Sequence, residues 1–250
     1  MPAFGDAGQL FDPFVYLGYL AANTKTIALG TASIILPLRH PAHVAKSAVS
    51  LDQLSGGRFI LGVASGDRPQ EYPAFSQDIM ARGELFRQSL AYIREMANEF
   101  PTFDNHFGTL RGDADMLPKP TGNKLPILIT GGSGQPPDFT SHHGDGWMIY
   151  PRPPSLQAMI IQDYRERLKL AGRPDQPVLQ PFHVDLAEDD NELPTKIHLG
   201  SRLGMTHLLE YLHTLEEIGV NHVMFNIRFG QTKVETTLKR LADDVLPRFA

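Results

Sequence analysis

The stretch Ile27–Asp67 reads IALGTASIILPLRHPAHVAKSAVSLDQLSGGRFILGVASGD, and it predicts the fold of the chain. An apolar run over Thr26–Ile35 is followed by a polar loop, a helical pattern over Pro41–Leu54 and a second apolar run over Arg58–Ala64. Two strands joined through a helix run parallel, and this unit builds α/β barrels and open α/β sheets. In a barrel the chemistry lies where the strands end. The residues that follow each run are therefore the first candidates for a functional site.

The rest of the chain continues this alternation. Four further short apolar runs bounded by turn residues are typical of buried strands; they are Pro126–Thr130, Gly146–Tyr150, Val178–Leu186 and His222–Ile227. Helical patterns with one apolar face separate most of the strands; they are Pro13–Ala22, Glu84–Phe100, Leu156–Ala171, Ser201–Ile218 and Thr232–Leu246. Polar or proline-flanked segments near residues 103–120 and 185–200 fit neither pattern. We expect them to be irregular insertions in a single domain over residues 1–250.

Composition narrows the class of protein. The chain has 250 residues, about the size of one barrel domain, and its net charge of −5 lacks the basic footprint of a nucleic-acid-binding protein. It has no cysteine, which excludes disulfides, thiolate metal sites and cysteine nucleophiles. No apolar run approaches the roughly 20 residues of a membrane helix, and the first ten residues do not resemble a signal peptide. These features predict a cytoplasmic protein that binds neither nucleic acid nor a membrane.

Six motifs in order along the chain resemble the bacterial luciferase-like monooxygenase superfamily, a group of flavin- or deazaflavin-dependent barrels. They are LGTASIILPLRHP, SLDQLSGGRFILGVASGD, YPAFSQD with the following Arg82, LPILITGGSGQ, HGDGWMIYPR and GVNHVMFNIRFG. Family members carry a strand, a helix and a second strand before the helix that here begins at Pro13. The chain has about a dozen residues there, too few for a βαβ unit of roughly 30. The resemblance predicts a TIM (β/α)8-type barrel, truncated at its N-terminus to about six strands.

The resemblance also implies where a flavin would lie. It places a strand bulge with a cis peptide bond at Ala32-Ser33, behind the flavin ring. Ser65, Gly66 and Asp67 follow the next strand and are expected to line the flavin, and Gly66 would permit a close approach of the backbone. The alternative for Ala32 and Ser33 is an ordinary strand with small residues for packing.

A glycine-rich turn follows the strand at Pro126–Thr130. Backbone N–H groups at the start of a helix bind anions, and the resemblance implies that Gly132, Ser133 and Gly134 hold the FMN phosphate. The turn is not a Walker loop, because no Gly-Lys-Ser/Thr follows it. The alternative is a strand-to-helix turn that needs glycine only for its geometry.

Two arginines are candidate phosphate ligands. Arg82 matches an arginine that the family carries near the cofactor phosphate, and a guanidinium fork suits a phosphate dianion. Its alternative role is a surface ion pair with Asp78 or Glu84. Arg152 follows the strand at Gly146–Tyr150 and could meet the phosphate or an anionic substrate, or could serve only the structure of its loop.

His40 is the candidate catalytic residue. It follows the first strand at the active face of a barrel, and histidine side chains exchange protons near neutral pH. The alternative is that His40 caps or packs the start of the next helix. No carboxylate or third histidine stands at ligand spacing beside His40 and His43, so we expect no metal site. Asp52 and Arg58 lie at the opposite end of the strands, and we expect them to fix the helix-to-strand turn.

Together these features predict a flavin-dependent oxidoreductase, a monooxygenase that uses reduced FMN and molecular oxygen on a small organic substrate. Deazaflavin F420 is the alternative cofactor. The expected partners are a separate flavin reductase and a second copy of the chain in a homodimer. An incomplete barrel also fits a non-catalytic flavin-binding or truncated paralogue. A hydrolase is less well supported, because the sequence has no G-x-S-x-G motif.

Overall fold

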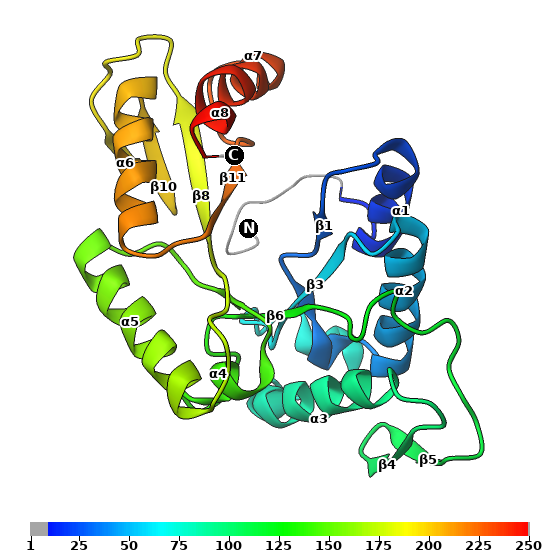
Figure 1. The fold of residues 1–250 in the computed structure, drawn as a ribbon. Coiled ribbons are helices and arrows are strands. Elements are labelled where there is room, and N and C mark those ends of the chain that lie inside the picture. Colours follow the sequence, from blue (N-terminus) through cyan, green and yellow to red (C-terminus); the bar gives the residue numbers. More distant parts are fainter. Residues whose placement is uncertain (1–9, 250) are drawn as a thin grey trace. The chain divides into compact units, whose positions relative to one another are not determined.

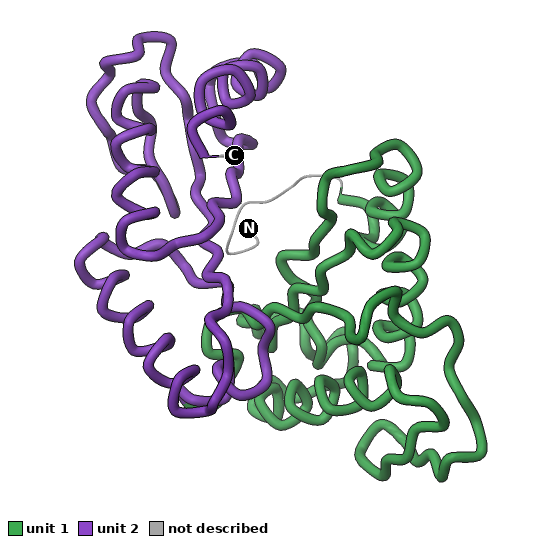
Figure 2. Tube along the Cα trace, in the orientation of Figure 1, with its two compact units in different colours: residues 1–136 green, residues 137–250 purple. Residues whose placement is uncertain are grey.

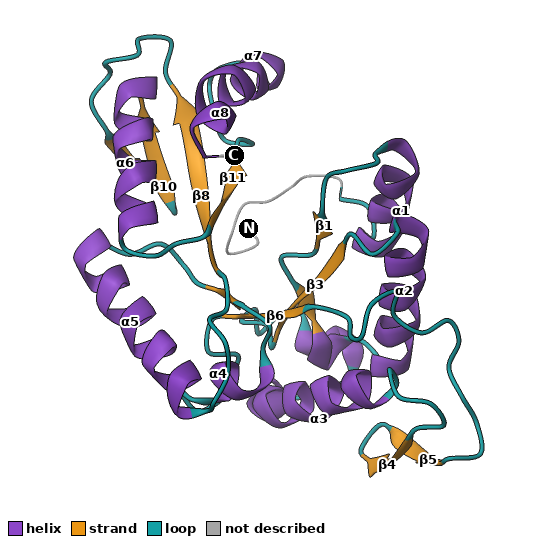
Figure 3. Cartoon of the chain, in the orientation of Figure 1, coloured by secondary structure: helices purple, strands orange, loops and turns teal. Residues whose placement is uncertain are grey.

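The computed structural model describes residues 10–249 (Figure 1). The chain divides into two compact units, with the boundary between Pro136 and Pro137 (Figure 2). Each unit combines strands with helices, as the alternating sequence pattern predicts (Figure 3). The single domain over residues 1–250 stays a prediction.

The first unit contains the part of the chain that the Ile27–Asp67 stretch builds. Its elements are α1 (Pro13–Asn23), β1 (Leu29–Gly30), β2 (Ile34–Ile35), a 3₁₀ helix (Leu36–Leu38), α2 (Pro41–Ser55), β3 (Phe59–Ala64), two further 3₁₀ helices (Tyr72–Phe75 and Ile79–Ala81), α3 (Arg82–Glu95), β4 (Thr102–Asn105), β5 (Gly108–Arg111) and β6 (Ile127–Thr130).

The main sheet of the first unit is parallel and has β3 at its centre. β1 and β2 pair with one edge of β3, one after the other, and β6 pairs with the other edge. The side chains of Phe59, Leu61 and Val63 on β3 are fully buried, and α2 packs against this strand and against α3. Because all these strands run in one direction, the ends of β2, β3 and β6 lie at the same edge of the sheet.

Capping residues explain where the first helices begin and end. The Asp12 carboxylate accepts hydrogen bonds from the backbone N–H groups of Phe14 (3.0 Å) and Val15 (3.3 Å), which starts α1. α2 ends at Gly56, whose φ of +69° is the left-handed conformation that glycine adopts at low cost. The predicted bounds of both helices agree with the structure to within a residue.

The second unit contains the remaining elements. They are α4 (Phe139–His143), β7 (Trp147–Met148), α5 (Pro154–Leu170), β8 (Val178–Leu186), β9 (Thr195–Ile197), β10 (Gly200–Leu203), α6 (Met205–Glu217), β11 (His222–Asn226), α7 (Val234–Arg240), a π-helical turn (Leu241–Val245) and α8 (Leu246–Phe249).

β8 is the central strand of the second unit. β7, β10 and β11 all pair with it in parallel. An apolar core joins β8 to α6 and to the π-helical turn; its buried members are Phe182, Val184, Leu186, Leu203, Met205, Leu208, Leu212, Leu241 and Val245. The spacing of apolar residues on α6 thus buries one helix face against the sheet, as an amphipathic helix should.

The two segments expected to be irregular each contain an antiparallel strand pair, so that expectation is wrong in part. β4 pairs with β5, and β9 pairs with β10. These strands have few apolar residues, because β4, β5 and β9 are largely exposed. The hydrophobic pattern that marks a buried strand is therefore absent from them.

The helices formed by residues 10–249 include none that combines the length and the apolar character required to cross a membrane.

Candidate functional site

A β-bulge interrupts the first strand of the sheet. Gly30 pairs with Ile60 of β3, and Ile34 pairs with Val63. Four residue steps on the first strand therefore face three steps on β3, which leaves one extra residue between β1 and β2. The Thr31 hydroxyl fills the gap in the ladder, because it bonds both the N–H and the C=O of Gly62 at 2.9 Å.

The peptide bond Ala32-Ser33 in this bulge is cis. The bulge and the cis bond, which the family resemblance implied, are both confirmed. The contact of Ala32 and Ser33 with a flavin stays a prediction.

Small side chains and hydroxyl groups lie at the carboxyl end of one face of β3. Side chains alternate along a strand, so Gly62 and Ala64 face away from the fully buried side chains of β3. The register of β6 puts Thr130 on the same face as Gly62. The Ser33 hydroxyl reaches across β3 and forms a hydrogen bond with the Thr130 hydroxyl. This face therefore combines two small residues and a pair of hydroxyl groups at its carboxyl end with the bulkier Ile60 and Leu128 beside them.

A hydrogen bond from Tyr72 fixes the segment that follows β3. Ser65 is buried, and its carbonyl accepts a hydrogen bond from the Tyr72 hydroxyl. Gly66 has a φ of +79°, which favours glycine. Asp67 is exposed. Sequence reasoning missed Tyr72, although YPAFSQD was among the motifs of the resemblance.

The turn after β6 adopts left-handed backbone conformations at Gly131, Ser133 and Gly134. The Ser133 hydroxyl donates to the Thr130 carbonyl at 2.8 Å, and the Gln135 N–H donates to the Gly132 carbonyl at 2.9 Å. These bonds fix a tight turn. The next helix along the chain, α4, begins at Phe139.

This turn packs directly on the first residues of α3. A Cβ atom added to Gly83 would lie 2.8 Å from the Gly134 carbonyl oxygen, so only glycine allows the contact without a shift of the backbone. The Gln135 side chain completes the junction by donating from its Nε2 to the Gly83 carbonyl at 2.7 Å. The turn Gly132–Gly134 and the first residues of α3, which include Arg82, are thereby brought together. A glycine at the start of a helix, here Gly83, is the signal that could have indicated this junction.

Arg82 has no carboxylate partner among the residues that the structure describes. Its Nη1 donates to the Ile79 carbonyl at 3.3 Å. The two carboxylates proposed as alternative partners have other contacts: Asp78 accepts from the Met80 N–H at 2.9 Å, and Glu84 pairs with Arg87. The half-buried guanidinium at the start of α3 therefore has no opposing carboxylate among the described residues.

His40 is the N-cap of α2. Its Nδ1 accepts a hydrogen bond from the Ala42 N–H at 3.2 Å, so Nε2 carries the proton that goes to the Phe107 carbonyl, also at 3.2 Å. Its ring also contacts the ring of Tyr92. Both ring nitrogens thus have structural partners. These contacts favour the capping role, and the catalytic role of His40 stays a prediction.

The turn at the opposite end of the strands has the expected structural contacts. Arg58 donates from its guanidinium to carbonyl groups that include those of Ala21, Ile27 and Ser55. Asp52 is buried, and its carboxylate accepts a hydrogen bond from the Thr121 N–H at 2.6 Å. The prediction that Arg58 fixes the helix-to-strand turn is confirmed by its bond to Ser55, whereas the Asp52 side chain binds a distant segment and its role in the turn stays a prediction.

Arg152 is the one predicted ligand that belongs to the second unit. It is exposed and donates from Nη1 to the Tyr150 carbonyl at 3.0 Å. This bond supports the loop that follows β7. A role of Arg152 in binding stays a prediction.

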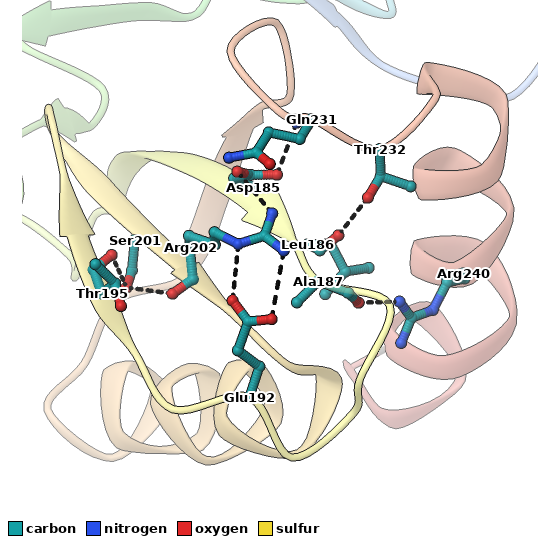
Figure 4. Close-up of polar contacts among 10 residues, drawn as sticks. All are labelled: Asp185, Leu186, Ala187, Glu192, Thr195, Ser201, Arg202, Gln231, Thr232 and Arg240. Carbon is teal, nitrogen blue, oxygen red and sulfur yellow. Dashed lines mark hydrogen bonds and ion pairs between the residues drawn. The ribbon is translucent and has the colours of Figure 1, made fainter.

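The end of β8 in the second unit is occupied by an ion network (Figure 4). Arg202 lies between two carboxylates, with Nη1 3.0 Å from Asp185 Oδ2 and Nε 2.7 Å from Glu192 Oε1. These hydrogen bonds, to Asp185 first and then to Glu192, raise the pKa of Arg202. Asp185 is almost fully buried, and its second oxygen accepts from the Gln231 N–H at 2.8 Å. The Arg202 guanidinium and the Gln231 N–H thus both donate to carboxylates of the chain itself.

The family of the chain follows from comparison with known proteins. The model of the luciferase-like monooxygenase family matches residues 2–230. The chain belongs to this family. An uncharacterized protein of Mycobacterium tuberculosis is 30% identical over 221 residues, which are 83% of this chain and 74% of the relative. The alkanal monooxygenase beta chain of Photorhabdus luminescens is 28% identical over 196 residues, which are 76% of this chain and 55% of the relative.

Solved structures show the same fold. Monooxygenase RslO1 from Streptomyces bottropensis has a TM-score of 0.75 at 19% identity, covering 96% of this chain and 83% of its own. A coenzyme F420 dependent tetrahydromethanopterin reductase from Methanopyrus kandleri has a TM-score of 0.78 at 15% identity, covering 96% and 88%. A type II Baeyer–Villiger monooxygenase of Pseudomonas putida, solved with FMN, has a TM-score of 0.60 at 20% identity, covering 72% and 54%. The predicted α/β fold of the luciferase-like barrel type is confirmed.

Proposed function

We propose that this member of the luciferase-like monooxygenase family binds FMN at the ends of β2, β3 and β6. Reduced FMN and molecular oxygen would then serve to oxidise a small organic substrate. The observation that carries the proposal is the junction of the glycine turn Gly131–Gly134 with the start of α3. There Gly83 packs on the Gly134 carbonyl, and the guanidinium of the preceding residue, Arg82, has no opposing carboxylate among the described residues. Membership of the family supports the class of reaction.

The groups at this junction fit a phosphate. α3 begins at Arg82 directly after the 3₁₀ helix Ile79–Ala81, and the Arg82 N–H donates to the Ile79 carbonyl, so the candidate donors here are the Arg82 guanidinium and the turn. A Cβ atom added at Gly131 or Gly132 would meet no atom within 4 Å, so the backbone of the turn is open to close approach. A guanidinium can bind two oxygens of one phosphate at once. The turn and the arginine thus form a donor set suited to the FMN monoester.

The sheet face beside the junction fits a flat ring. Gly62 and Ala64 offer no bulky side chain, Leu128 pairs with Gly62 and adds an apolar contact, and the hydroxyl groups of Ser33 and Thr130 bond to each other at the carboxyl end of the sheet. The Ser65 carbonyl and the Gly66 backbone form its rim at the end of β3. Polar rim groups would orient the ring, while the small side chains would let it lie against the sheet.

The division of labour between the cofactor and the chain follows from these groups. When bound, the flavin supplies the redox chemistry with oxygen and substrate. Arg82 and the glycine turn would neutralise and anchor the phosphate, and the segment Ser65–Asp67 would fix the ring in one orientation. Packing of the ring against the sheet would exclude water from one of its faces.

F420 is the second candidate cofactor. The likeness to the F420-dependent reductase, which covers 96% of this chain, supports it. F420 joins its ring side chain to a phosphodiester, whereas FMN ends in a monoester that carries more charge. A fork of donors around one arginine favours the monoester, and for this reason we propose FMN. From the resemblance to the luciferase-like family we also propose that a separate flavin reductase supplies the reduced FMN and that the chain forms a homodimer.

Titration of the purified chain with FMN and with F420 tests the proposal, with flavin fluorescence and visible circular dichroism as signals. We expect saturable binding of FMN in the micromolar range or tighter, on the scale of about −8 kcal/mol, and substrate-dependent oxygen uptake when reduced FMN is supplied. Tighter binding of F420 than of FMN would identify F420 as the cofactor. Binding without oxidation of any member of a substrate panel would favour the non-catalytic paralogue, and failure to bind either cofactor would contradict the proposal.

A further inference from the structure

Tyr72 supports the segment that we expect to contact the flavin ring, although it lies outside the ring-facing surface itself. We propose that Tyr72 is a positioning residue of the cofactor site, whose hydroxyl holds Ser65 and Gly66 in the geometry that ring binding requires. This inference rests on the proposed function, because it concerns the same site.

The contact between Tyr72 and this segment is buried. Only 1% of Tyr72 is exposed, and its hydroxyl donates a hydrogen bond to the Ser65 carbonyl, seven residues earlier in the chain. Ser65 is itself only 6% exposed. The carbonyl is the last one before the chain turns at Gly66, so this bond fixes the direction in which the chain leaves β3.

Gly66 packs closely against the Tyr72 hydroxyl. A Cβ atom added at Gly66 would lie 3.0 Å from the Tyr72 hydroxyl oxygen and 2.8 Å from Cγ2 of Ile35. The backbone of Gly66 is therefore enclosed between the end of β2 and the tyrosine. A change in the position of the hydroxyl must move the segment, because no free space separates them.

The surroundings of Tyr72 keep its hydroxyl protonated. Burial raises the pKa of Tyr72, and the carboxylates of Glu71 and Asp67 raise it further, whereas the nearby charge of Arg82 lowers it. The net effect is a raised pKa, so the group remains a donor at neutral pH.

Removal of the Tyr72 hydroxyl should make the segment Ser65–Asp67 more mobile without leaving a cavity in the core. In Tyr72→Phe the ring remains, while the buried Ser65 carbonyl loses its donor, and an unsatisfied buried carbonyl is unfavourable. Tyr92→Phe is the matched control. Tyr92 is a buried tyrosine of the same unit, and burial raises its pKa as well, but it lies on α3 and contacts the rings of Phe103 and His40.

The test compares FMN with riboflavin, which has the same ring and lacks the phosphate. We expect Tyr72→Phe to weaken the binding of both ligands by the same factor, about fivefold, because the ring segment is loosened and the phosphate junction is not. Tyr92→Phe should leave both dissociation constants unchanged. A loss confined to FMN, or equal binding by Tyr72→Phe and wild type, would overturn the proposal.

Hydrogen–deuterium exchange of the ligand-free proteins supplies an independent readout. Backbone amides within residues 65–71 should exchange several-fold faster in Tyr72→Phe than in wild type, and at the wild-type rate in Tyr92→Phe. Unchanged exchange in Tyr72→Phe would overturn the proposal. If the wild type binds neither FMN nor riboflavin, the FMN form of the proposed function fails too. If the wild type binds and only the Tyr72 results are negative, the positioning role alone fails.

Discussion

Two arginines near the ends of parallel strands have opposite surroundings. Arg202 in the second unit lies between the carboxylates of Asp185 and Glu192 (Figure 4). Arg82 in the first unit has no ion pair among residues 10–249 and borders a turn of glycines and a serine. An arginine already paired with carboxylates within the chain stabilises the fold, whereas one without an opposing carboxylate can bind an external anion. The partners of the two residues therefore separate structure from function.

The largest change in stability should come from breaking the ion network around Arg202. Asp185→Ala removes a buried carboxylate that receives both Arg202 and the Gln231 N–H, so we expect the free energy of unfolding to fall by about 3 kcal/mol. Urea denaturation measures this change. Glu192→Gln, at a more exposed partner of the same arginine, should cost less than about 1 kcal/mol. Equal costs for the two variants would contradict our view of the network.

Removal of the other arginine should change binding more than stability. Arg82→Met is expected to weaken FMN by about 2 kcal/mol, or roughly thirtyfold, because a charge-assisted contact with phosphate is lost. Riboflavin binding should not change, and neither should the denaturation midpoint. Arg68→Met, at a surface arginine that pairs with Glu71 at 3.5 Å, is the control and should leave both ligands unaffected. An equal loss for FMN and riboflavin in Arg82→Met would argue against a phosphate contact.

A pair of glycine variants separates backbone conformation from packing at the site. Gly56 and Gly66 both have positive φ, but a Cβ at Gly56 would meet nothing within 4 Å, whereas one at Gly66 would meet Ile35 and Tyr72. Gly56→Ala should cost about 1 kcal/mol of unfolding free energy, and Gly66→Ala about 1.5 kcal/mol. Thermal denaturation compares the two. Only Gly66→Ala should also weaken flavin binding, and an effect of Gly56→Ala on binding would contradict the location of the site.

The smallest expected effect concerns the serine of the glycine turn. Ser133→Ala removes a hydroxyl that donates to the Thr130 carbonyl at 2.8 Å, and FMN binding should weaken by about 0.7 kcal/mol, or roughly threefold. Ser55→Ala removes the same kind of bond, from Ser55 to the Asp52 carbonyl at 3.1 Å, at the opposite end of the strands. This control should bind FMN as wild type does, and a matching loss in Ser55→Ala would show that the effect is general.

Much of this architecture could be predicted from the sequence, because its signals are local. The apolar run of β8 and the proline and glycine that bound α2 gave the elements nearly residue by residue. The resemblance also gave the bulge and the cis bond at Ala32-Ser33, which composition alone does not indicate.

Contacts between distant segments could not be predicted in the same way. The pairing of β10 with β8 depends on Gly200, where an added Cβ would lie 1.8 Å from the His183 carbonyl oxygen, but the strand has no apolar run. Gly83 meets Gly134 across fifty residues of sequence, and Tyr72 reaches back to Ser65. These residues matter because of what they touch, and a single sequence does not record that.

The most direct test of the account is a crystal structure of the chain with FMN. We expect the phosphate oxygens within about 3 Å of the Arg82 guanidinium and of the backbone N–H groups of Gly132–Gly134, with the ring over Gly62 and Ala64. A phosphate bound away from Arg82 and the glycine turn would contradict the central claim that these groups form the anion site.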